Sequence, residues 1–230
     1  MRVARYVLRQ KLLDALPDAI DARFSLGIDA ADKLESGRMR VSLSNGSIDE
    51  CDLLVAADGA NSKIRAELRP EDTLKYAGAV SITATARSTN GGPAPIKQDH
   101  GIVISGTDAS LFASPIDHHS ADWSVSTLQL GPQEYSSREQ TREMQNRIID
   151  EARRKGKEFT ELFNISLEAT APENLMVLNA MDKSPIDHAE MTGAPVVLTG
   201  DSNHAVGEPV IGQATRELTS RRPTGLALRR

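Results

Sequence analysis

The stretch CDLLVAADGANSKIR, residues 51–65, decides the fold. Its apolar run, Leu53 to Ala57, is typical of a strand that is covered on both faces, as in a parallel sheet. Asp58 and Gly59 follow where this strand should end, and ligands bind at such ends in open parallel sheets. Small residues there let a polar ligand approach the backbone, and polar residues after them can cap a helix. Judged by spacing alone, an ordinary strand-to-helix turn is an equally good interpretation.

A second stretch, PVVLTGDSNHA at residues 195–205, repeats this arrangement. Its apolar run also ends in a small residue and a carboxylate, Gly200 and Asp201. A carboxylate at a strand end can accept hydrogen bonds from ligand hydroxyl groups, and the N-terminus of a following helix favours an anionic ligand group. Two such strands in one chain predict two walls of a single ligand site.

Composition limits the class of protein. The chain has 230 residues, enough for one large or two modest domains. A net charge of −5 and an aromatic content of only 3% argue against a nucleic-acid partner. The single cysteine, Cys51, excludes an internal disulfide framework and fits a reducing compartment. Because we see no signal peptide and no apolar segment of membrane-spanning length, we expect a cytoplasmic protein without a membrane span.

The remaining patterns predict a mixed chain with two kinds of sheet. A helix with an apolar leucine stripe is expected first, then a hairpin before the buried strand, and later a run of antiparallel strands with one covering helix. The strand from Val80 alternates in polarity and should have one solvent-exposed face. The expected ranges are helices at 5–16 and 136–155 and strands at 21–28, 39–43, 48–51, 53–57, 80–87, 101–105, 111–116, 123–130, 174–181 and 195–199.

Four segments carry a family resemblance. LLVAADGANSKIR resembles the DG motif of FAD-dependent aromatic-ring monooxygenases, the para-hydroxybenzoate hydroxylase-like family, and VVLTGDSNHA resembles the family's GD motif. RYVLRQKLLDAL is similar to the Arg-x-x-Leu helix on the cofactor side. NAMDKSPIDH, residues 179–188, is similar to the segment that leads into the GD strand. The matches follow the family's order and cover most of the chain.

The resemblance implies an α/β (mixed α+β) fold in two domains. Residues 1–70 and 186–230 would form a partial FAD/NAD(P)-binding domain with a parallel sheet. Residues 71–185 would form an antiparallel-sheet substrate domain with its covering helix.

The resemblance also implies chemistry and site residues. FAD would be the cofactor, NAD(P)H would reduce it, and the reduced flavin would use O2 to hydroxylate a small organic substrate, aromatic in this family. Asp201 would bind the ribityl chain, Asp58 and Gly59 would lie near the pyrophosphate, and Arg5 would contact the cofactor. We expect Asp58 to fix its loop by accepting backbone N–H bonds. The remaining expected cofactor-binding residues are Gly200 and Pro209. We assign no catalytic acid or base, and the substrate would lie between the flavin and strands 101–105 and 111–116.

The chain also departs from the family pattern. The family binds the ADP half of FAD with a GxGxxG loop, and the sequence contains no such loop. Pro209 comes one residue later after His204 than the family pattern places it. We therefore expect a chain truncated at both ends, and the alternative function is a non-catalytic remnant or binding module of the same family.

The sequence gives weaker support to two other kinds of site, a hydrolase site and a metal site. GDSNH is reminiscent of an esterase block, but a Ser202 nucleophile needs a separate base, and no G-x-S-x-G elbow is present. The pair His118–His119 has no third metal ligand nearby, so we predict a solvated loop and no metal site.

Overall fold

The computed structural model describes residues 5–88, 101–105, 109–134, 140–187 and 193–206. The chain divides into two compact units. The first unit contains the described residues between 5 and 77 and between 181 and 206, and the second contains those between 78 and 180. The mixed α/β class predicted from the sequence is confirmed, since the described residues contain a parallel pair of strands and two sheets with antiparallel pairing. The predicted domain ranges and their functions stay a prediction.

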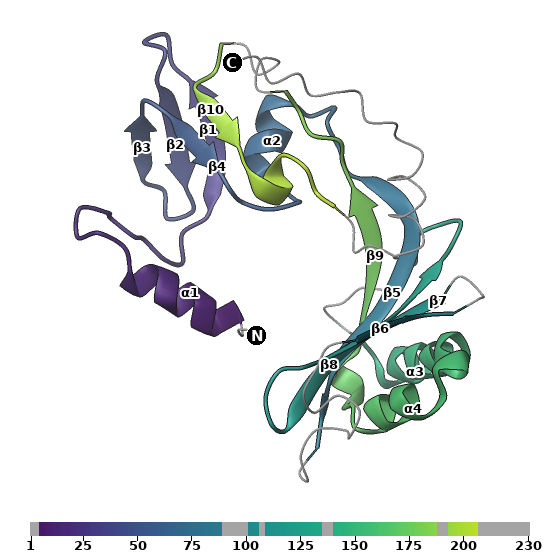
Figure 1. Cartoon of the computed structure of the whole chain (residues 1–230). Coiled ribbons are helices and arrows are strands. Elements are labelled where there is room, and N and C mark those ends of the chain that lie inside the picture. Colours follow the sequence, from purple (N-terminus) through teal and green to yellow (C-terminus); the bar gives the residue numbers. More distant parts are fainter. Residues whose placement is uncertain (1–4, 89–100, 106–108, 135–139, 188–192, 207–230) are drawn as a thin grey trace, which may run out of the picture. The chain divides into compact units, whose positions relative to one another are not determined.

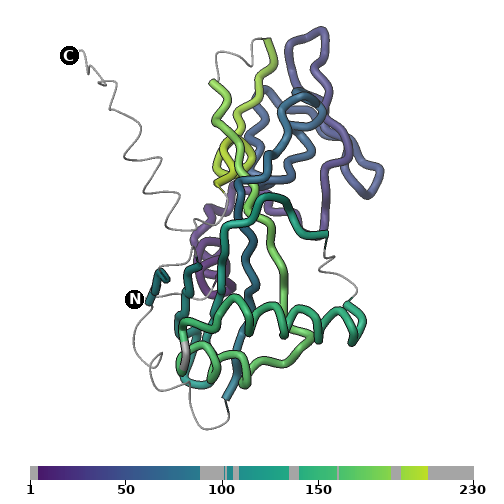
Figure 2. The backbone as a smooth tube through the Cα atoms, turned by 90° about the vertical axis from the view of Figure 1, so that its right-hand side faces the viewer, coloured from purple at the N-terminus to yellow at the C-terminus, as the bar shows by residue number. Residues whose placement is uncertain are grey.

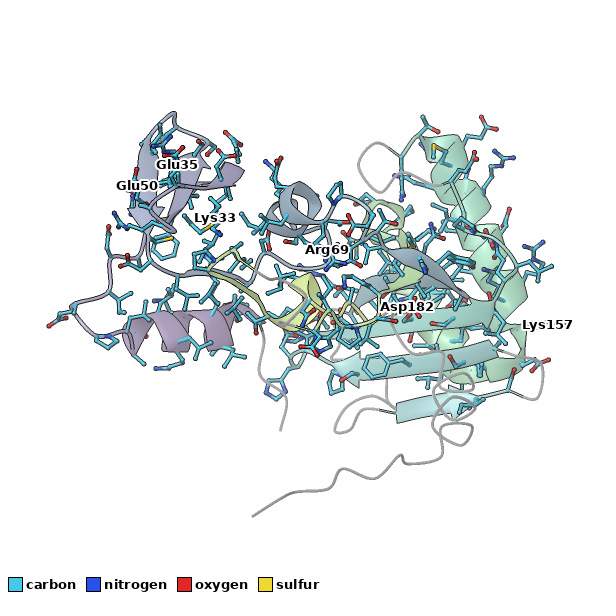
Figure 3. The ribbon with its side chains drawn as sticks, turned by 90° about the horizontal axis from the view of Figure 1, so that it is seen from above. Lys33, Glu35, Glu50, Arg69, Lys157 and Asp182 are labelled. Carbon is cyan, nitrogen blue, oxygen red and sulfur yellow. The ribbon has the colours of Figure 1, made fainter. Side chains whose placement is uncertain are left out.

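The first unit begins with a helix and a small antiparallel sheet. Its elements are α1 (Arg5–Asp14), β1 (Ile28–Lys33), β2 (Met39–Leu43), β3 (Ile48–Cys51), β4 (Leu54–Ala56), α2 (Lys63–Leu68) and β10 (Val196–Leu198). Strands β1, β2 and β3 form the antiparallel sheet, from which Lys33 and Glu50 extend (Figure 3). β4 and β10 form a separate parallel pair. The predicted strand at 21–28 is wrong: Ser25 has a positive φ of 58°, and the strand begins only at Ile28.

The core of the first unit lies between the two sheets and α2. Met39 and Ala31 of the small sheet pack with Ile64 of α2 and with one face of the β4–β10 pair, Ala56 and Leu198 included. The opposite face of β4 is exposed, with 55% of Leu53 and 56% of Val55 accessible. The prediction that the run is covered on both faces is therefore wrong for the described residues, because they supply a covering layer on one side only.

Helix α1 forms as predicted but is not buried. None of its residues is buried, and Leu8 and Leu12 of the predicted apolar stripe are 51% and 61% accessible. Helical spacing correctly gives one apolar face, since residues three and four apart share a side. Whether that face meets a partner depends on packing, and the described part of the chain buries none of it.

The second unit is a five-stranded sheet with two helices on one face. Its strands are β5 (Lys75–Arg87), β6 (Gly101–Ile104), β7 (Ala109–Pro115), β8 (Ser120–Leu128) and β9 (Met176–Asp182), in the order β6-β7-β8-β5-β9. The pairs β6–β7, β7–β8 and β5–β8 are antiparallel, as predicted. Helices α3 (Arg142–Gly156) and α4 (Thr160–Glu168) contact each other and lie together against the sheet (Figures 1 and 2).

An aromatic contact joins these helices to the sheet. Trp123 of β8 and Phe163 of α4 are almost fully buried, and their rings meet edge to face at 5.4 Å. The indole N–H donates to Thr170 Oγ1 at 2.9 Å, so the polar edge of the ring is also satisfied. The start of α3 differs from the prediction. Thr141 is its N-cap, accepting from the Met144 N–H, and the predicted capping serines 136 and 137 lie outside the described residues.

The prediction that the polar face of β5 is exposed to solvent is wrong. Its apolar face is buried as expected, with Val80 and Ile82 fully enclosed, but Ser81 on the opposite face is only 2% exposed. The alternation predicts which residues share a face, but it does not predict whether the polar face meets water. Among the described residues, no helix combines the length and the apolar composition needed to cross a bilayer.

Gly156, the last residue of α3, generates a stability prediction. A Cβ at this position would lie 2.3–2.5 Å from the ring atoms of Phe163. Although Gly→Ala in a helix normally stabilises, we expect Gly156→Ala to destabilise the fold by about 1–3 kcal/mol, because the buried ring has no room to move.

Urea denaturation of both variants measures this effect. Gly131→Ala is the matched control, since nothing lies within 4 Å of its Cβ position. If Gly156→Ala were as stable as the control, the close packing of Phe163 on α3 would be contradicted.

Candidate functional site

Two parallel strands bring the two acidic turns together. Leu54 pairs with Val196 and Ala56 with Leu198, so β4 and β10 run in register to the same end. Asp58 follows β4 by two residues and Asp201 follows β10 by three. Because the carboxyl ends of parallel strands meet at one sheet edge, the turns that carry both aspartates follow the strands at that edge; Figure 1 shows β4 beside β10. The predicted convergence of the two turns is therefore present in the first unit.

Each turn depends on a glycine with a left-handed backbone. Gly59 has φ +84° and Gly200 has φ +58°, values that L side chains rarely adopt. A Cβ at either position would meet nothing within 4 Å. The turns therefore need glycine for conformation, and both leave open space beside the backbone in which a ligand can approach.

Asp58 closes its own turn. Its Oδ2 accepts the backbone N–H of Lys63 at 2.9 Å and lies 3.5 Å from that of Ile64, at the first turn of α2. Ser62 is the N-cap of the same helix and accepts the Arg65 N–H at 3.0 Å. The expectation that Asp58 fixes the loop through backbone N–H bonds is confirmed. These amides are consequently not available to bind an anionic ligand.

Asp201 has a different environment. It is exposed in a single 3-10 turn, Gly200–Ser202, and makes no hydrogen bond or ion pair within the described part of the chain. Its two oxygens are therefore free to accept hydrogen bonds from hydroxyl groups of a ligand. The two carboxylates thus differ in function, since Asp58 holds a turn and Asp201 is open to solvent.

A buried arginine joins the two turns. Arg65 of α2 is only 4% exposed, and its guanidinium donates from Nη1 to the Ser202 carbonyl at 2.7 Å and from Nη2 to the Ala60 carbonyl. Ser202 belongs to the second acidic turn and Ala60 to the first. A planar guanidinium with several fixed donors can bind two separate carbonyls at once, which an ammonium does less well. Arg65 therefore sets the spacing of the two turns.

Two further charged groups complete this buried network. The Lys183 ammonium lies 2.8 Å from Asp72 Oδ2 and also donates to the Ser184 carbonyl at 2.7 Å. Asp72 Oδ2 lies 4.0 Å from Arg65 Nε as well. The Lys183 side chain is 2% exposed and that of Asp72 is 19% exposed, so this carboxylate offsets two cations in a site with little water.

Ser202 acts as a structural hydroxyl. Its side chain is fully buried, and Oγ lies 2.7 Å from the Ala56 carbonyl across the strand pair and accepts the Thr199 N–H at 3.0 Å. A hydroxyl enclosed and bonded in this way is not placed to attack a substrate. The geometry thus gives no support to the esterase interpretation of GDSNH.

The other predicted site residues are less informative. Arg5 is exposed on the first turn of α1, and no hydrogen bond or ion pair among the described residues joins it to either acidic turn. Pro209 lies outside the described residues. His119 lies in the β7–β8 turn, where its backbone N–H donates to Asp117 Oδ1 at 2.8 Å. The described residues contain no group of three or more potential metal ligands among His, Cys, Asp and Glu.

Comparison with known proteins supports the resemblance found in the sequence. No family model matches the chain. Monooxygenase cfoF from Aspergillus candidus is 35% identical over 213 residues, a match that covers 89% of this chain and 50% of the relative. The resemblance to the monooxygenases is confirmed. The chain spans about half the length of this curated relative.

Solved structures show the same fold at lower identity. HpxO from Klebsiella pneumoniae, solved with FAD and uric acid, has a TM-score of 0.65 at 19% identity, covering 92% of this chain and 50% of that one. The 2,6-dihydroxypyridine-3-hydroxylase from Arthrobacter nicotinovorans has a TM-score of 0.59 at 15% identity, covering 79% and 49%. Both similarities support the flavin monooxygenase fold.

Sequence reasoning missed the network beneath the turns. It predicted a helix start after the DG turn but gave Arg65 no partner, and it did not single out Asp72 or Lys183. The signal was weak, because these three residues are separated by up to 118 positions and share no spacing pattern. Only the folded chain brings them together.

The Arg65 contacts generate a second prediction. Arg65→Met should destabilise the first unit by roughly 3 kcal/mol, because two buried carbonyls lose their donor and Asp72 loses a nearby cation. Arg65→Lys should recover only part of the lost stability, since it restores the positive charge but not the planar guanidinium that donates to two carbonyls at once.

Urea denaturation measures the difference, with Arg40→Met as the control. Arg40 pairs with Glu50 at 3.5 Å with 45% of its side chain exposed, so its loss should cost at most about 1 kcal/mol. Equal effects of the two Met substitutions would contradict a role for Arg65 in joining the turns.

Proposed function

We propose that this chain carries the ribityl-binding side and the substrate sheet of an FAD-dependent monooxygenase that hydroxylates a small aromatic substrate with NAD(P)H and O2. The observation that carries the proposal is the parallel pairing of β4 with β10, which places Asp58 and Asp201 at one sheet edge. The sequence relationship to a monooxygenase over 213 residues supports it independently.

The described residues suit one half of the cofactor. Asp201 is exposed and unpaired within the described chain, and Gly200 and Gly59 leave the adjacent backbone open, so hydroxyl groups of a ribityl chain fit this edge. The other half has no match, because the sequence contains no GxGxxG loop for the pyrophosphate and adenosine. Bound flavin would supply the redox chemistry, and the protein would supply binding and orientation.

The remaining site residues have proposed roles consistent with this arrangement. Asp58 holds the first turn in shape and Arg65 holds the two turns at a fixed spacing. Arg5 and Pro209 are proposed cofactor contacts on the family resemblance alone. Residues 1–70 and 186–230 are the proposed cofactor domain, and residues 71–185 are the proposed substrate domain.

The proposal makes a prediction about the isolated 230-residue chain. The purified protein should be colourless, and added FAD and FMN should bind with similar weak affinities, because the adenosine half of FAD finds no dedicated loop. Quenching of flavin fluorescence during titration measures both affinities. A yellow preparation with stoichiometric FAD, or a large preference for FAD over FMN, would contradict this assignment.

Asp201 provides the sharper test of the site. Asp201→Asn should weaken flavin binding by roughly 10- to 100-fold, because hydrogen bonds to a carboxylate contribute about 1.5–3 kcal/mol. The measurement is the same titration, or one on a longer polypeptide that also contains an ADP-binding unit.

Asp182→Asn is the matched control, since Asp182 is an exposed carboxylate at the end of β9 (Figure 3). The control should leave flavin affinity unchanged. Unchanged affinity in Asp201→Asn would remove Asp201 from the site and leave the non-catalytic alternative as the better description.

A further inference from the structure

The segment that follows β9 supports the second acidic turn. Two of its backbone N–H groups donate to residues that come shortly after Asp201. The Lys183 N–H donates to the Ala205 carbonyl at 3.0 Å. The Ile186 N–H donates to Asn203 Oδ1 at 2.8 Å. All of these residues belong to the first unit, so the turn has a support there in addition to the buried guanidinium on α2.

Asp72 connects these two supports. Its Oδ2 lies 2.8 Å from Lys183 Nζ and 4.0 Å from Arg65 Nε. Arg65 in turn donates to the Ser202 carbonyl, and Figure 1 shows α2, which carries Arg65, beside the turn that follows β10. A single carboxylate therefore anchors both of the cations whose segments hold the backbone directly after Asp201.

The burial of this ion pair argues for a role in geometry. The side chain of Lys183 is 2% exposed and that of Asp72 is 19% exposed. The cost of removing two charges from water offsets much of their attraction, so a buried ion pair adds little net stability, and apolar residues of similar size often do as well. What the pair supplies is a fixed distance between the segment before β5 and the segment after β9, because charged groups without water must keep their partners.

The second acidic turn needs such external support. It is a single 3-10 turn of three residues, in which the Asn203 and His204 N–H groups both donate to the Gly200 carbonyl at 3.0 Å. The Asp201 side chain is exposed and adds no bond of its own within the described part of the chain. A turn with so few internal bonds opens readily unless neighbouring segments hold it, and the direction of the carboxylate then varies with the backbone.

We propose that Asp72 and Lys183 are positioning residues for ligand binding at Asp201. Together with Arg65 they fix the backbone of the second acidic turn, so that the carboxylate meets the hydroxyl groups of a ribityl chain in one geometry. This inference rests on the proposed function for the identity of the ligand. The rigidity of the turn is a property of the first unit and is measurable without any ligand.

Lys183→Met is the test variant, because it removes one cation and leaves Asp72 facing Arg65, so that no buried charge loses its only counter-charge. Riboflavin and lumiflavin are the probes, since they share the flavin ring and lumiflavin has a methyl group in place of the ribityl chain. Fluorescence titration of the 230-residue chain gives the ratio of the two affinities. Lys183→Met should lower this ratio by at least about threefold, and Lys183→Arg, which keeps a cation, should lower it less.

A double-mutant cycle separates positioning from general destabilisation. If Lys183 acts through Asp201, Lys183→Met should cause no further fall of the ratio in the Asp201→Asn variant, because the carboxylate that it positions is already absent. Lys155→Met is the matched control. Lys155 is also a cation with 10% of its side chain exposed, and it lies 3.0 Å from Glu151 in α3 of the second unit. Its loss should leave the ratio unchanged.

Hydrogen exchange measures the turn directly. The amides of Asn203 and His204 should exchange at least about threefold faster in Lys183→Met than in the original chain, because the turn opens more often once its support is loosened. The amides of the small sheet β1–β3 belong to the same unit and should keep their exchange rates. The Lys155→Met control should leave the turn amides unchanged.

Three results would overturn the inference: turn amides that exchange in Lys183→Met as in the original chain, a rise in exchange that is equal throughout the first unit, or an affinity ratio that Asp201→Asn lowers and Lys183→Met does not. A different result tests the proposed function. If the original chain binds riboflavin no better than lumiflavin, the cofactor proposal fails, and the exchange rates still decide whether Lys183 holds the turn.

Discussion

Arg65 is the residue on which the arrangement of the site depends. Its guanidinium donates to the carbonyl of Ala60 in one turn and to that of Ser202 in the other, and Ser202 lies 137 positions after Arg65 in the chain. Hydrogen bonds between a buried cation and backbone carbonyls are strong, because little water competes for either partner. With the β4–β10 ladder, this side chain fixes both acidic turns, so Asp201 can face solvent while the backbone around it stays ordered.

The first unit combines this polar network with an unusual amount of exposed apolar surface. Leu53 and Val55 on one face of β4 and the leucines of α1 are accessible, although a parallel strand is normally covered on both faces. Burial of such surface contributes about 25 cal/mol per Å². In the second unit, by contrast, Trp123 and Phe163 are buried where the sheet meets the two helices.

The two faces of the sheet in the second unit differ in composition. Aliphatic and aromatic residues on the helix side form the core, and short hydroxyl residues form the other face.

The sequence alone predicted most of the element types, the mixed α/β class, the family resemblance and the positions of the two acidic turns. These follow from local patterns: apolar runs, alternation, glycine at a strand end and a carboxylate beside it. It also correctly assigned Asp58 to its own loop, because a carboxylate before a helix commonly accepts N–H bonds.

The tertiary structure decided which surfaces are covered and which charges meet. It left α1 and one face of β4 exposed, buried the polar face of β5 and joined Arg65, Asp72 and Lys183 into one network. Periodicity shows that residues share a face, but not what lies against that face. Contacts between residues more than a hundred positions apart depend on the whole fold, since no local spacing encodes them.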